Sequence, residues 1–242
     1  MGRKIIIIGA SSGIGRELAK VAGQHGYIVG ITARRSELLR EAAEGSSGPV
    51  FVKRMDVANP DEAIGLLGEL IGEMGGVDIV VISAGIGFPN PELEWKKEKD
   101  TIDVNVTGFA AIADSAMKYF LKQGRGHLVG ISSIAAIRGD LTAPAYSASK
   151  AFVSNYLEGL RLKALKTGLP IVVTDIQPGF VDTAMAQGDG LFWVAPPEKA
   201  ARQIFNVIEK RQKHAYITGR WRFVAWILKI VPDRLLAKWG EQ

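Results

Sequence analysis

The chain has no cysteine and only three histidines among its 242 residues. Without cysteine it can form no disulfide framework and no thiolate site for zinc or an iron–sulfur cluster. His25, His127 and His214 lie far apart in the sequence and lack the short spacings of a metal motif. We therefore expect no metal, and a chain of this size can bury roughly 70% of its unfolded surface and fold on its apolar core alone.

A strong excess of charge of one sign is also missing. Lys and Arg number 30 against 25 Asp and Glu, which gives a net charge of +5 dispersed along the chain. Such a balance does not favour a nucleic-acid partner. The early apolar run at residues 5–8 is too short for the hydrophobic region of a signal peptide, so we expect a cytoplasmic location.

What the sequence does have is a regular alternation of short β-branched runs with longer helical patterns. Several runs are apolar throughout, as strands buried on both faces of a parallel sheet require, and helices must then cover both faces. We predict an α/β fold, a single doubly wound, Rossmann-like domain over residues 1–218 with about seven parallel strands. Strands are predicted at residues 5–8, 27–32, 50–53, 77–82, 127–131 and 171–176. Helices are predicted at residues 13–25, 36–44, 60–74, 94–122, 145–167 and 196–210.

A glycine-rich turn follows the first predicted strand directly and leads into a helical pattern. In a parallel sheet such a turn lets the backbone approach a pyrophosphate, which then lies on the unpaired amides of the helix N-terminus. Tight strand-to-helix turns also use glycine for geometry alone, but at the first such junction of the chain we favour dinucleotide binding. The residues predicted to bind are Gly9, Ser11, Ser12, Gly13, Ile14 and Gly15.

The end of the second predicted strand decides which dinucleotide fits. An NAD site places an acidic residue there for the ribose 2′-hydroxyl, whereas this chain has Arg34 and Arg35. The first carboxylate, Glu37, follows Ser36, which suits a helix N-cap, so we expect Glu37 in the first helical turn and not at the ribose. Two guanidiniums suit a 2′-phosphate, so NADP(H) is preferred and NAD(H) remains open. The alternative is a solvated basic loop.

A phenol and an ammonium, Tyr146 and Lys150, are four residues apart and therefore share one helical face. Such a pair on its own is more often a surface pair than a catalytic one. Ser133 follows the fifth predicted strand, and in an open parallel sheet the strand C-termini line the ligand crevice. The three side chains could converge there.

With these residues the sequence resembles the short-chain dehydrogenase/reductase family, in its compact single-domain form, over residues 3–218. The motifs appear in the family's order: the glycine turn, Asp56-Val57, Asn105 in Val104-Asn105-Val106-Thr107-Gly108, Ser133, the Tyr146/Lys150 pair, and the run Pro178-Gly179-Phe180-Val181-Asp182-Thr183.

The resemblance implies a role for each catalytic candidate. Tyr146 would be the general acid/base, and Lys150 would hold the nicotinamide ribose and lower the tyrosine pKa. Ser133 would bind the substrate oxygen, and Asn105 would support a water-linked proton path. Further cofactor contacts are implied for Asp56, Val57, Ala84, Gly85, Tyr146, Lys150, Pro178, Gly179, Val181 and Thr183.

One position departs from the family pattern. The family usually has Asn-Asn-Ala-Gly after the fourth strand, and this chain has Ile82-Ser83-Ala84-Gly85. Ala84 and Gly85 still allow close approach to the cofactor ribose, but the hydrogen bonds of the two asparagine amides cannot be carried over.

The segment between Thr183 and Pro196 contains Leu191, Phe192 and Trp193, which a surface loop has little reason to expose together. We interpret residues 184–195 as a substrate lid with hinges at Gly188 and Gly190, the alternative being static packing. Together with Phe88 and Leu141, the lid predicts an apolar pocket for a hydrophobic ketone, aldehyde or alcohol.

The chain ends in an apolar, amphipathic extension at residues 219–242. Its run from Trp221 to Val231 is interrupted by Lys229 and is too short for the about 20 residues of a bilayer span. Three roles fit: a helix packed between subunits, a flap over the substrate, or a helix lying on a membrane surface. We favour the subunit contact, in a homodimer or homotetramer.

These features predict an enzyme that transfers a hydride between NADP(H) and a carbonyl/alcohol pair on a hydrophobic small molecule. The alternative is a catalytically idle NAD(P)-binding regulator or scaffold of the same fold. An idle relative is expected to lose one of Ser133, Tyr146 or Lys150, and this chain retains all three.

Overall fold

The structure, a computed structural model, describes residues 2–184 and 192–239. Its centre is a sheet in the order β3-β2-β1-β4-β5-β6-β7, in which every pair of neighbours is parallel. The strands are β1 (Lys4–Ile8), β2 (Ile28–Ala33), β3 (Val50–Arg54), β4 (Ile79–Ile82), β5 (Gly126–Ile131), β6 (Ile171–Pro178) and β7 (His214–Ile217). The predicted doubly wound α/β fold is confirmed, and β7 is a strand that the sequence pattern did not locate.

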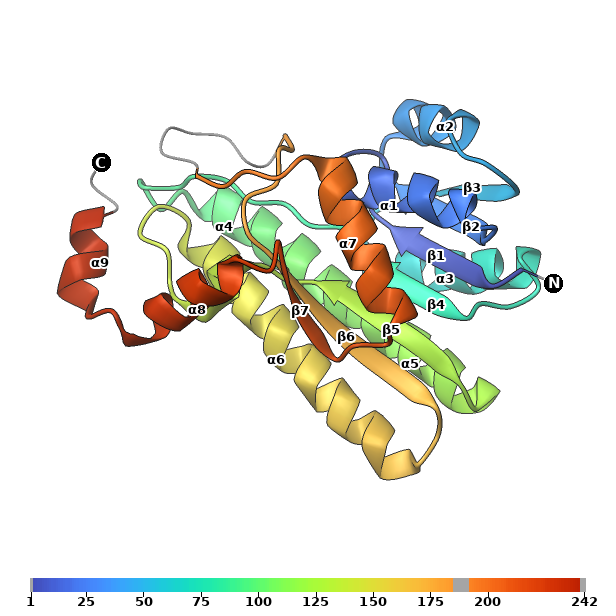
Figure 1. The fold of residues 1–242 in the computed structure, drawn as a ribbon. Helices are drawn as coiled ribbons and strands as arrows, with labels where there is room; N and C mark the ends of the chain where they lie inside the picture. The colour runs from blue at the N-terminus through green and yellow to red at the C-terminus, as the bar shows by residue number, and fades with distance from the viewer. Residues whose placement is uncertain (1, 185–191, 240–242) are drawn as a thin grey trace.

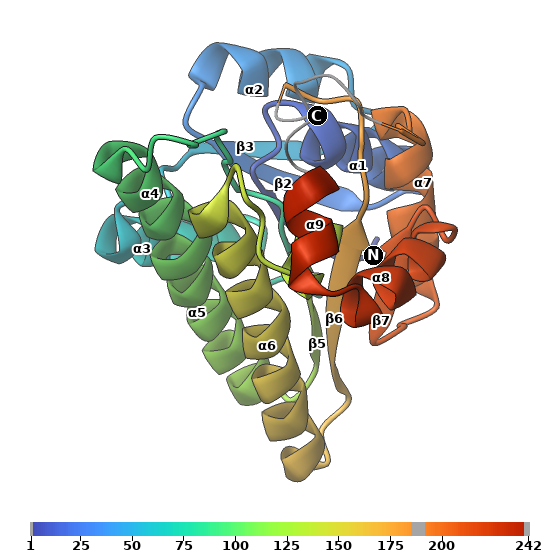
Figure 2. The same ribbon diagram turned by 90° about the vertical axis from the view of Figure 1, so that its left-hand side faces the viewer.

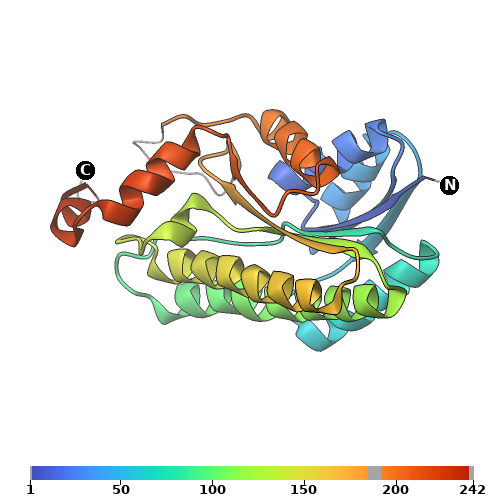
Figure 3. The same ribbon diagram turned by 60° about the horizontal axis from the view of Figure 1, so that its bottom comes forward.

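Helices cover both faces of the sheet, as Figures 1 and 3 show. The helices are α1 (Gly13–Gln24), α2 (Ser36–Glu44), α3 (Pro60–Glu73), α4 (Trp95–Ile102), α5 (Phe109–Gln123), α6 (Pro144–Thr167), α7 (Pro197–Glu209), α8 (Trp221–Ile230) and α9 (Asp233–Trp239). In Figure 3, α1 and α7 lie on one side of the sheet, and α5 and α6 lie on the other.

The alternation of side chains along β1 explains why its apolar run is uninterrupted. Ile5 and Ile7 belong to an apolar cluster with Leu18 of α1, whereas Ile6 and Ile8 belong to a second cluster with Phe120 of α5. Successive residues of a strand point to opposite faces, so a strand covered on both sides must be apolar at every position. The core therefore has two layers, one on each face of the sheet.

The helix predicted at residues 94–122 is interrupted in the structure. A π-helical segment, η1 (Asp103–Gly108), separates α4 from α5 and contains Asn105. Two close contacts coincide with the wider turn: the Asn105 amide bonds the backbone of Ile86, and Gly108 lies against the carbonyl of Val57. Such π segments inside α-helices are frequent at functional sites.

The C-terminal helices α8 and α9 lie at the end of the molecule where β-strands finish, away from the N-terminus (Figures 1 and 2). The same end carries the start of α4 and the loop before α6. Among the helices of residues 2–184 and 192–239, none has both the length and the apolarity needed to cross a bilayer.

Candidate active site

The glycine turn between β1 and α1 is shaped by backbone contacts. Gly9 has a φ of +90°, and a Cβ there would lie 2.5 Å from the amide nitrogen of Ala84. A Cβ on Gly15 would lie 2.3 Å from the carbonyl oxygen of Gly9. The amides of Gly9 and Ala10 both donate to the carbonyl of Thr32 at the end of β2, at 2.8 and 3.0 Å. The turn is therefore packed against both neighbouring strands and admits no side chain at Gly9 or Gly15.

The N-terminus of α1 has the properties of an anion site. Ser12 is its N-cap residue, but the Ser12 side chain caps none of the first-turn amides, and the first turn contains no acidic residue. Free amides at a positive helix end are a common site for phosphate groups. The glycine turn and this helix end fit the pyrophosphate of a dinucleotide.

Arg35 lies directly on the glycine turn. Its Nη2 donates to the hydroxyls of Ser11 and Ser12, at 3.1 and 2.9 Å. Arg34 is exposed beside it, and Glu37 lies in the first turn of α2 as expected. Ser36 is the first helical residue and Arg35 occupies the N-cap position, which corrects the expectation that Ser36 is the cap. A guanidinium on the turn, with no carboxylate between, fits an additional phosphate on the ribose.

The remaining cofactor candidates line the ends of neighbouring strands. A Cβ on Gly13 would lie 3.0 Å from the Thr183 side chain, so Thr183 covers the start of α1. Asp56 accepts the amide of Ala58 at 3.1 Å, and Val57 beside it is buried after β3. Val181 pairs with Ala195 in an isolated bridge that joins the two ends of the predicted lid.

Ser133, Tyr146 and Lys150 meet at the C-terminal end of β5. Lys150 is buried, donates to the carbonyl of Ile131 at 3.1 Å, and has its Nζ 5.7 Å from the centre of the Tyr146 ring. Ser133 is buried as the N-cap of the short helix η2 (Ile134–Ile137), where its Oγ accepts the amide of Ala135 at 3.1 Å. Two separate elements, η2 and α6, therefore bring the three side chains together.

Burial sets the proton affinities of this group. It raises the pKa of Tyr146 above its ordinary value, while the Ser133 side chain opposes the rise and Asp140 adds to it. This direction is opposite to the lowering that we expected from Lys150. Burial also lowers the pKa of Lys150 to about 8, and the carboxylate of Asp175 opposes that shift. Near neutral pH the protein alone therefore presents a neutral phenol beside a largely protonated amine.

Asn105 is almost fully buried, and every hydrogen-bonding group of its side chain amide is engaged. Its Oδ1 accepts the amide of Ile86 at 2.9 Å, and its Nδ2 donates to the carbonyl of Ile86 at 2.7 Å and to Ser149 at 3.0 Å. The side chain thus fixes the segment after β4 to α6. This contact positions Ala84 and Gly85, although the family's asparagines are absent before them.

Two glycines of that segment bring backbone against the catalytic candidates. A Cβ on Gly85 would lie 3.2 Å from Lys150 Nζ, and a Cβ on Gly87 would lie 2.6 Å from the Tyr146 ring. Gly85 was among the predicted residues, whereas Gly87 and Ser149 were missed. The two glycines in Gly85-Ile86-Gly87 indicate that another group packs closely on this backbone, but the sequence does not identify that group.

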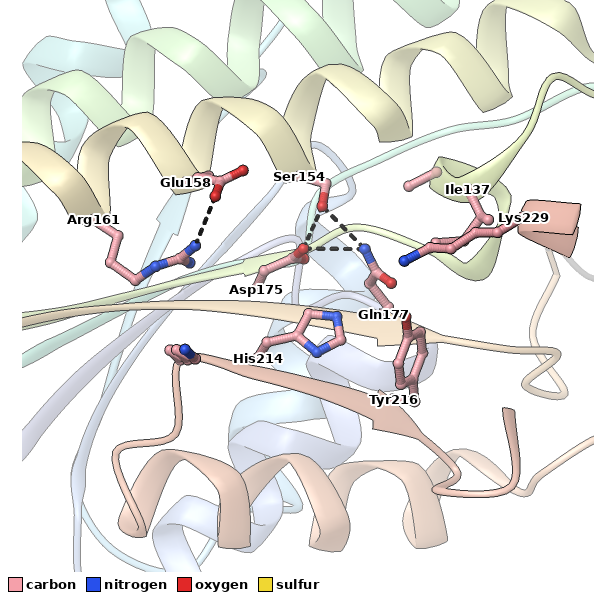
Figure 4. A pocket seen from close by; sticks show the side chains of 11 residues that line it. Ile137, Ser154, Glu158, Arg161, Asp175, Gln177, His214, Tyr216 and Lys229 are labelled. Carbon is pink, nitrogen blue, oxygen red and sulfur yellow. Dashed lines mark hydrogen bonds and ion pairs between the residues drawn. The ribbon is translucent and has the colours of Figure 1, made fainter. Parts of the chain in front are cut away.

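Asp175 is a buried carboxylate that the sequence analysis also missed. Its two oxygens bond Ser132, Ser154 at 2.5 Å and Gln177 at 3.2 Å, and Gln177 in turn bonds Ser154 at 3.0 Å (Figure 4). It lines a polar cavity of about 430 Å³ between α6 and β7, together with His214 and Lys229, and its carboxylate acts on the pKa of Lys150. The cavity lies beside the site and contains none of the predicted catalytic residues.

The described part of the predicted lid is tied to α8 by aromatic contacts. The ring of Phe192 stacks on Trp221 with centroids 5.2 Å apart, and Phe180 meets both rings edge-on. Arg220 donates to the carbonyl of Trp193 at 2.8 Å and lies over its ring. Residues 185–191, with Leu191 and both expected hinges, Gly188 and Gly190, lie outside the described residues.

Gly179 shows how closely α8 approaches the cofactor candidates. A Cβ there would lie 1.8 Å from the Trp221 ring, so only glycine fits between Pro178 and Phe180. In this chain Gly179 therefore serves the packing of α8 as well as its predicted place beside the cofactor.

Comparison with known proteins agrees with this geometry. A family model described as short chain dehydrogenase matches residues 3–190. An uncharacterized oxidoreductase of Myxococcus xanthus is 39% identical over 188 residues, which is 76% of this chain and 74% of the relative. The 11-beta-hydroxysteroid dehydrogenase 1A of Arabidopsis thaliana is 31% identical over 271 residues, 99% of this chain and 74% of the relative.

Solved structures show the same fold. A variant of actinorhodin polyketide ketoreductase with NADPH has a TM-score of 0.77 and 27% identity, and the match covers 86% of this chain and 90% of the other. A short-chain dehydrogenase/reductase from Burkholderia phymatum in complex with NAD has a TM-score of 0.84 at 20% identity, covering 93% and 92%. With the family model, the relatives and the geometry of the site all in agreement, the chain belongs to the short-chain dehydrogenase/reductase family of oxidoreductases.

Proposed function

We propose that the protein is an NADP(H)-dependent oxidoreductase that interconverts a carbonyl and an alcohol on a hydrophobic small molecule. The observation that carries the proposal is the meeting of Tyr146, Lys150 and Ser133 beside a glycine turn that carries Arg35. No observation favours the idle binding protein, because Ser133, Tyr146 and Lys150 are all present, with Ser133 and Lys150 buried and Tyr146 half-buried beside them.

The neutral Tyr146 phenol is the acid for carbonyl reduction. As the carbonyl oxygen gains negative charge, Tyr146 donates its proton and Ser133 donates a hydrogen bond to the same oxygen. Because burial raises the pKa of Tyr146, the phenol keeps its proton across the neutral range. In the oxidising direction the same group must accept a proton, and the nearby Lys150 cation favours the phenolate that this requires.

Lys150 would hold the cofactor ribose, and its own position is fixed by its hydrogen bond to the carbonyl of Ile131. When bound, the nicotinamide supplies or accepts the hydride. Gly85 and Gly87 keep the opposite wall close, so that no side chain enters between the ribose site and Tyr146. Asp175 stabilises the charged form of Lys150 from behind.

Cofactor preference rests on Arg35. Its bonds to Ser11 and Ser12 hold the guanidinium on the glycine turn, where a ribose 2′-phosphate could bond it bidentately. The relatives include structures with NADPH and with NAD, so the preference is supported by this residue and not by the family.

An apolar substrate is supported by the rim of the crevice. Phe88, Leu141, Phe192 and Trp193 are exposed in the segments after β4, before α6 and before α7, and large apolar side chains are exposed together mainly where something apolar binds. The steroid dehydrogenase and the polyketide ketoreductase are named for substrates with carbonyl or hydroxyl groups on a largely carbon framework. A homo-oligomeric assembly is part of the proposal, as members of this family often oligomerise.

The test is NADPH consumption with a panel of aldehydes and ketones of increasing chain length. We expect turnover with NADPH that improves with apolar length. The proposal is contradicted if the protein binds NADPH tightly but turns over no member of the panel with NADPH and none of the corresponding alcohols with NADP⁺. That result would support the idle binding protein.

A further inference from the structure

The helix α8 is apolar on two opposite faces. Its inner face, Trp221 and Ala225, is buried in a cluster with Ile134 of η2. Its outer face has no such cover: Phe223, Trp226 and Ile230 are 71%, 63% and 60% exposed. A helix that is apolar all round is ordinarily buried on all sides, so the outer face lacks a partner within the described chain.

The outer face of α8 lies at the same end of the molecule as most of the other exposed large apolar side chains. In residues 2–184 and 192–239, most of the exposed large hydrophobic side chains lie in segments 88–95, 192–194 and 223–235, together with Leu141. Figures 1 and 2 place α8, α9, the start of α4 and the loop before α6 at the same end of the molecule. We name the apolar end face by its most exposed members, Leu93, Trp95, Leu141, Phe223, Trp226 and Ile230.

The charges around α8 and α9 identify the partner. Arg222, Lys229 and Arg234 are exposed there, whereas the one acidic residue between positions 220 and 239, Asp233, is bonded to Arg138. Arg222 and Lys229 lie two turns apart on the side of α8 that faces β7, and Lys229 also lines the polar cavity there. We propose that the apolar end face binds the surface of an anionic lipid bilayer, with α8 in the plane of the interface.

Two further features favour lipid over a second copy of the chain. Because α8 has no acidic residue, a two-fold contact that packs α8 on α8 would offer its two cations no opposite charge on the partner helix. A short helix with an aromatic apolar face and flanking Lys and Arg is the pattern of helices that lie at a bilayer surface. With ten residues, about 15 Å long, α8 lies on the bilayer and does not cross it.

Lipid binding at this face gives the enzyme a source of substrate, and this part of the inference rests on the proposed function. Trp193 contacts Trp221 of α8, with ring centroids 6.2 Å apart, and Leu141 is exposed in the loop before α6, at the same end of the molecule as α8. A hydrophobic carbonyl compound dissolved in the bilayer would enter the crevice from the lipid side, and the apolar rim lets it do so without becoming hydrated.

The experiment is co-sedimentation of the full-length protein with vesicles of phosphatidylcholine alone or mixed with phosphatidylserine. We expect binding to the mixed vesicles that falls at high salt, and at least tenfold weaker binding of Phe223→Ser/Trp226→Ser. Arg222→Gln/Arg234→Gln should lose the preference for the anionic vesicles. The matched control is Leu162→Ser/Leu165→Ser, because these leucines are similarly exposed but lie on α6, outside the apolar end face.

Light scattering and NADPH binding of each variant complete the test. NADPH affinity equal to that of the wild type shows that a variant is folded. Failure of the wild type to bind anionic vesicles, or equal binding by both serine pairs, contradicts the inference. If the wild type does not bind vesicles and Phe223→Ser/Trp226→Ser has a lower molar mass than the wild type, the outer face of α8 is a subunit contact. That result also contradicts the inference. Vesicle binding does not depend on turnover, so an inactive enzyme that binds vesicles would contradict only the proposed function.

Discussion

The proposed cofactor half of the site, residues 9–57, and the proposed substrate half, formed by residues 86–95, 138–143 and 192–230, are built from different contacts. In the first half, backbone packs on backbone, as Gly9 does on Ala84 and Gly15 on Gly9. In the second half, large side chains such as Leu141 and Trp226 point into solvent. A site formed by backbone contacts tolerates almost no substitution. A site formed by exposed side chains can change its ligand through substitutions that leave the fold intact.

The largest effect is expected where the two halves meet. Tyr146→Phe removes the proton donor and keeps the ring that packs on Gly87, so turnover should fall by about 10² or more while NADPH binding stays unchanged. Stopped-flow or steady-state turnover, with a separate NADPH titration, measures this. Tyr156→Phe on the same helix is the control and should retain activity. Near-normal kcat in Tyr146→Phe would remove Tyr146 from the chemistry.

The cofactor half should be sensitive to a single methyl group. Gly9→Ala places a side chain at a φ of +90° and against the backbone of Ala84, which should lower the free energy of unfolding by about 3 kcal/mol and weaken NADPH binding. Gly65→Ala is the matched control, because it lies in α3 with nothing near its Cβ position and should be neutral or slightly stabilising. Thermal unfolding compares the two, and equal melting temperatures would contradict the steric account.

The same half also contains one replaceable side chain. Arg35→Ala should weaken NADPH binding by about 1.5 to 3 kcal/mol, roughly ten- to a hundredfold, and leave NADH binding nearly unchanged. Arg40→Ala, an exposed arginine on the same helix α2, should change neither dissociation constant. Measuring all four constants at low and moderate salt separates a specific contact from general charge. Equal loss of NADPH and NADH affinity would mean that Arg35 only supports the turn.

The difference between the halves also explains what the sequence could reveal. The parallel sheet was predictable because strands such as β1 must be apolar at every position, and the glycine turn because its spacing reflects steric need. Asp175, Ser149 and Gly87 were not predictable, because their roles depend on neighbours 25 to 59 residues away along the chain, such as Lys150, Asn105 and Tyr146. The break in the helix at Asn105 was hidden for a similar reason, since the bond that coincides with it joins Asn105 to Ile86, 19 residues away along the chain.

Asp175 lies outside both halves, and its replacement tests whether it sets the pKa of Lys150, which lies where the two halves meet. The pKa of Lys150 is about 8, and Asp175 raises it, so the charged form of Lys150 is lost as the pH rises through about 8. We expect carbonyl reduction to fall over that range in the wild type. In Asp175→Asn the fall should move to lower pH, with a severalfold loss at pH 8 and a smaller one at pH 6. A pH profile that keeps its midpoint in Asp175→Asn would leave Asp175 with a structural role only.

The smallest effect is expected in the substrate half, where one exposed wall residue can be shortened without moving the backbone. Asp140 Oδ1 accepts the amides of Thr142 and Ala143, at 2.7 and 3.0 Å, so the loop that carries Leu141 keeps its shape in Leu141→Ala. The loss of apolar contact should be about 1 kcal/mol, which raises KM for a long-chain carbonyl substrate about fivefold. KM for a short aldehyde that does not reach the rim, and kcat for both substrates, should stay the same. If KM changed by the same factor for both substrates, Leu141 would not contact the long-chain substrate. The apolar contact would then be assigned to Phe192 and Trp193.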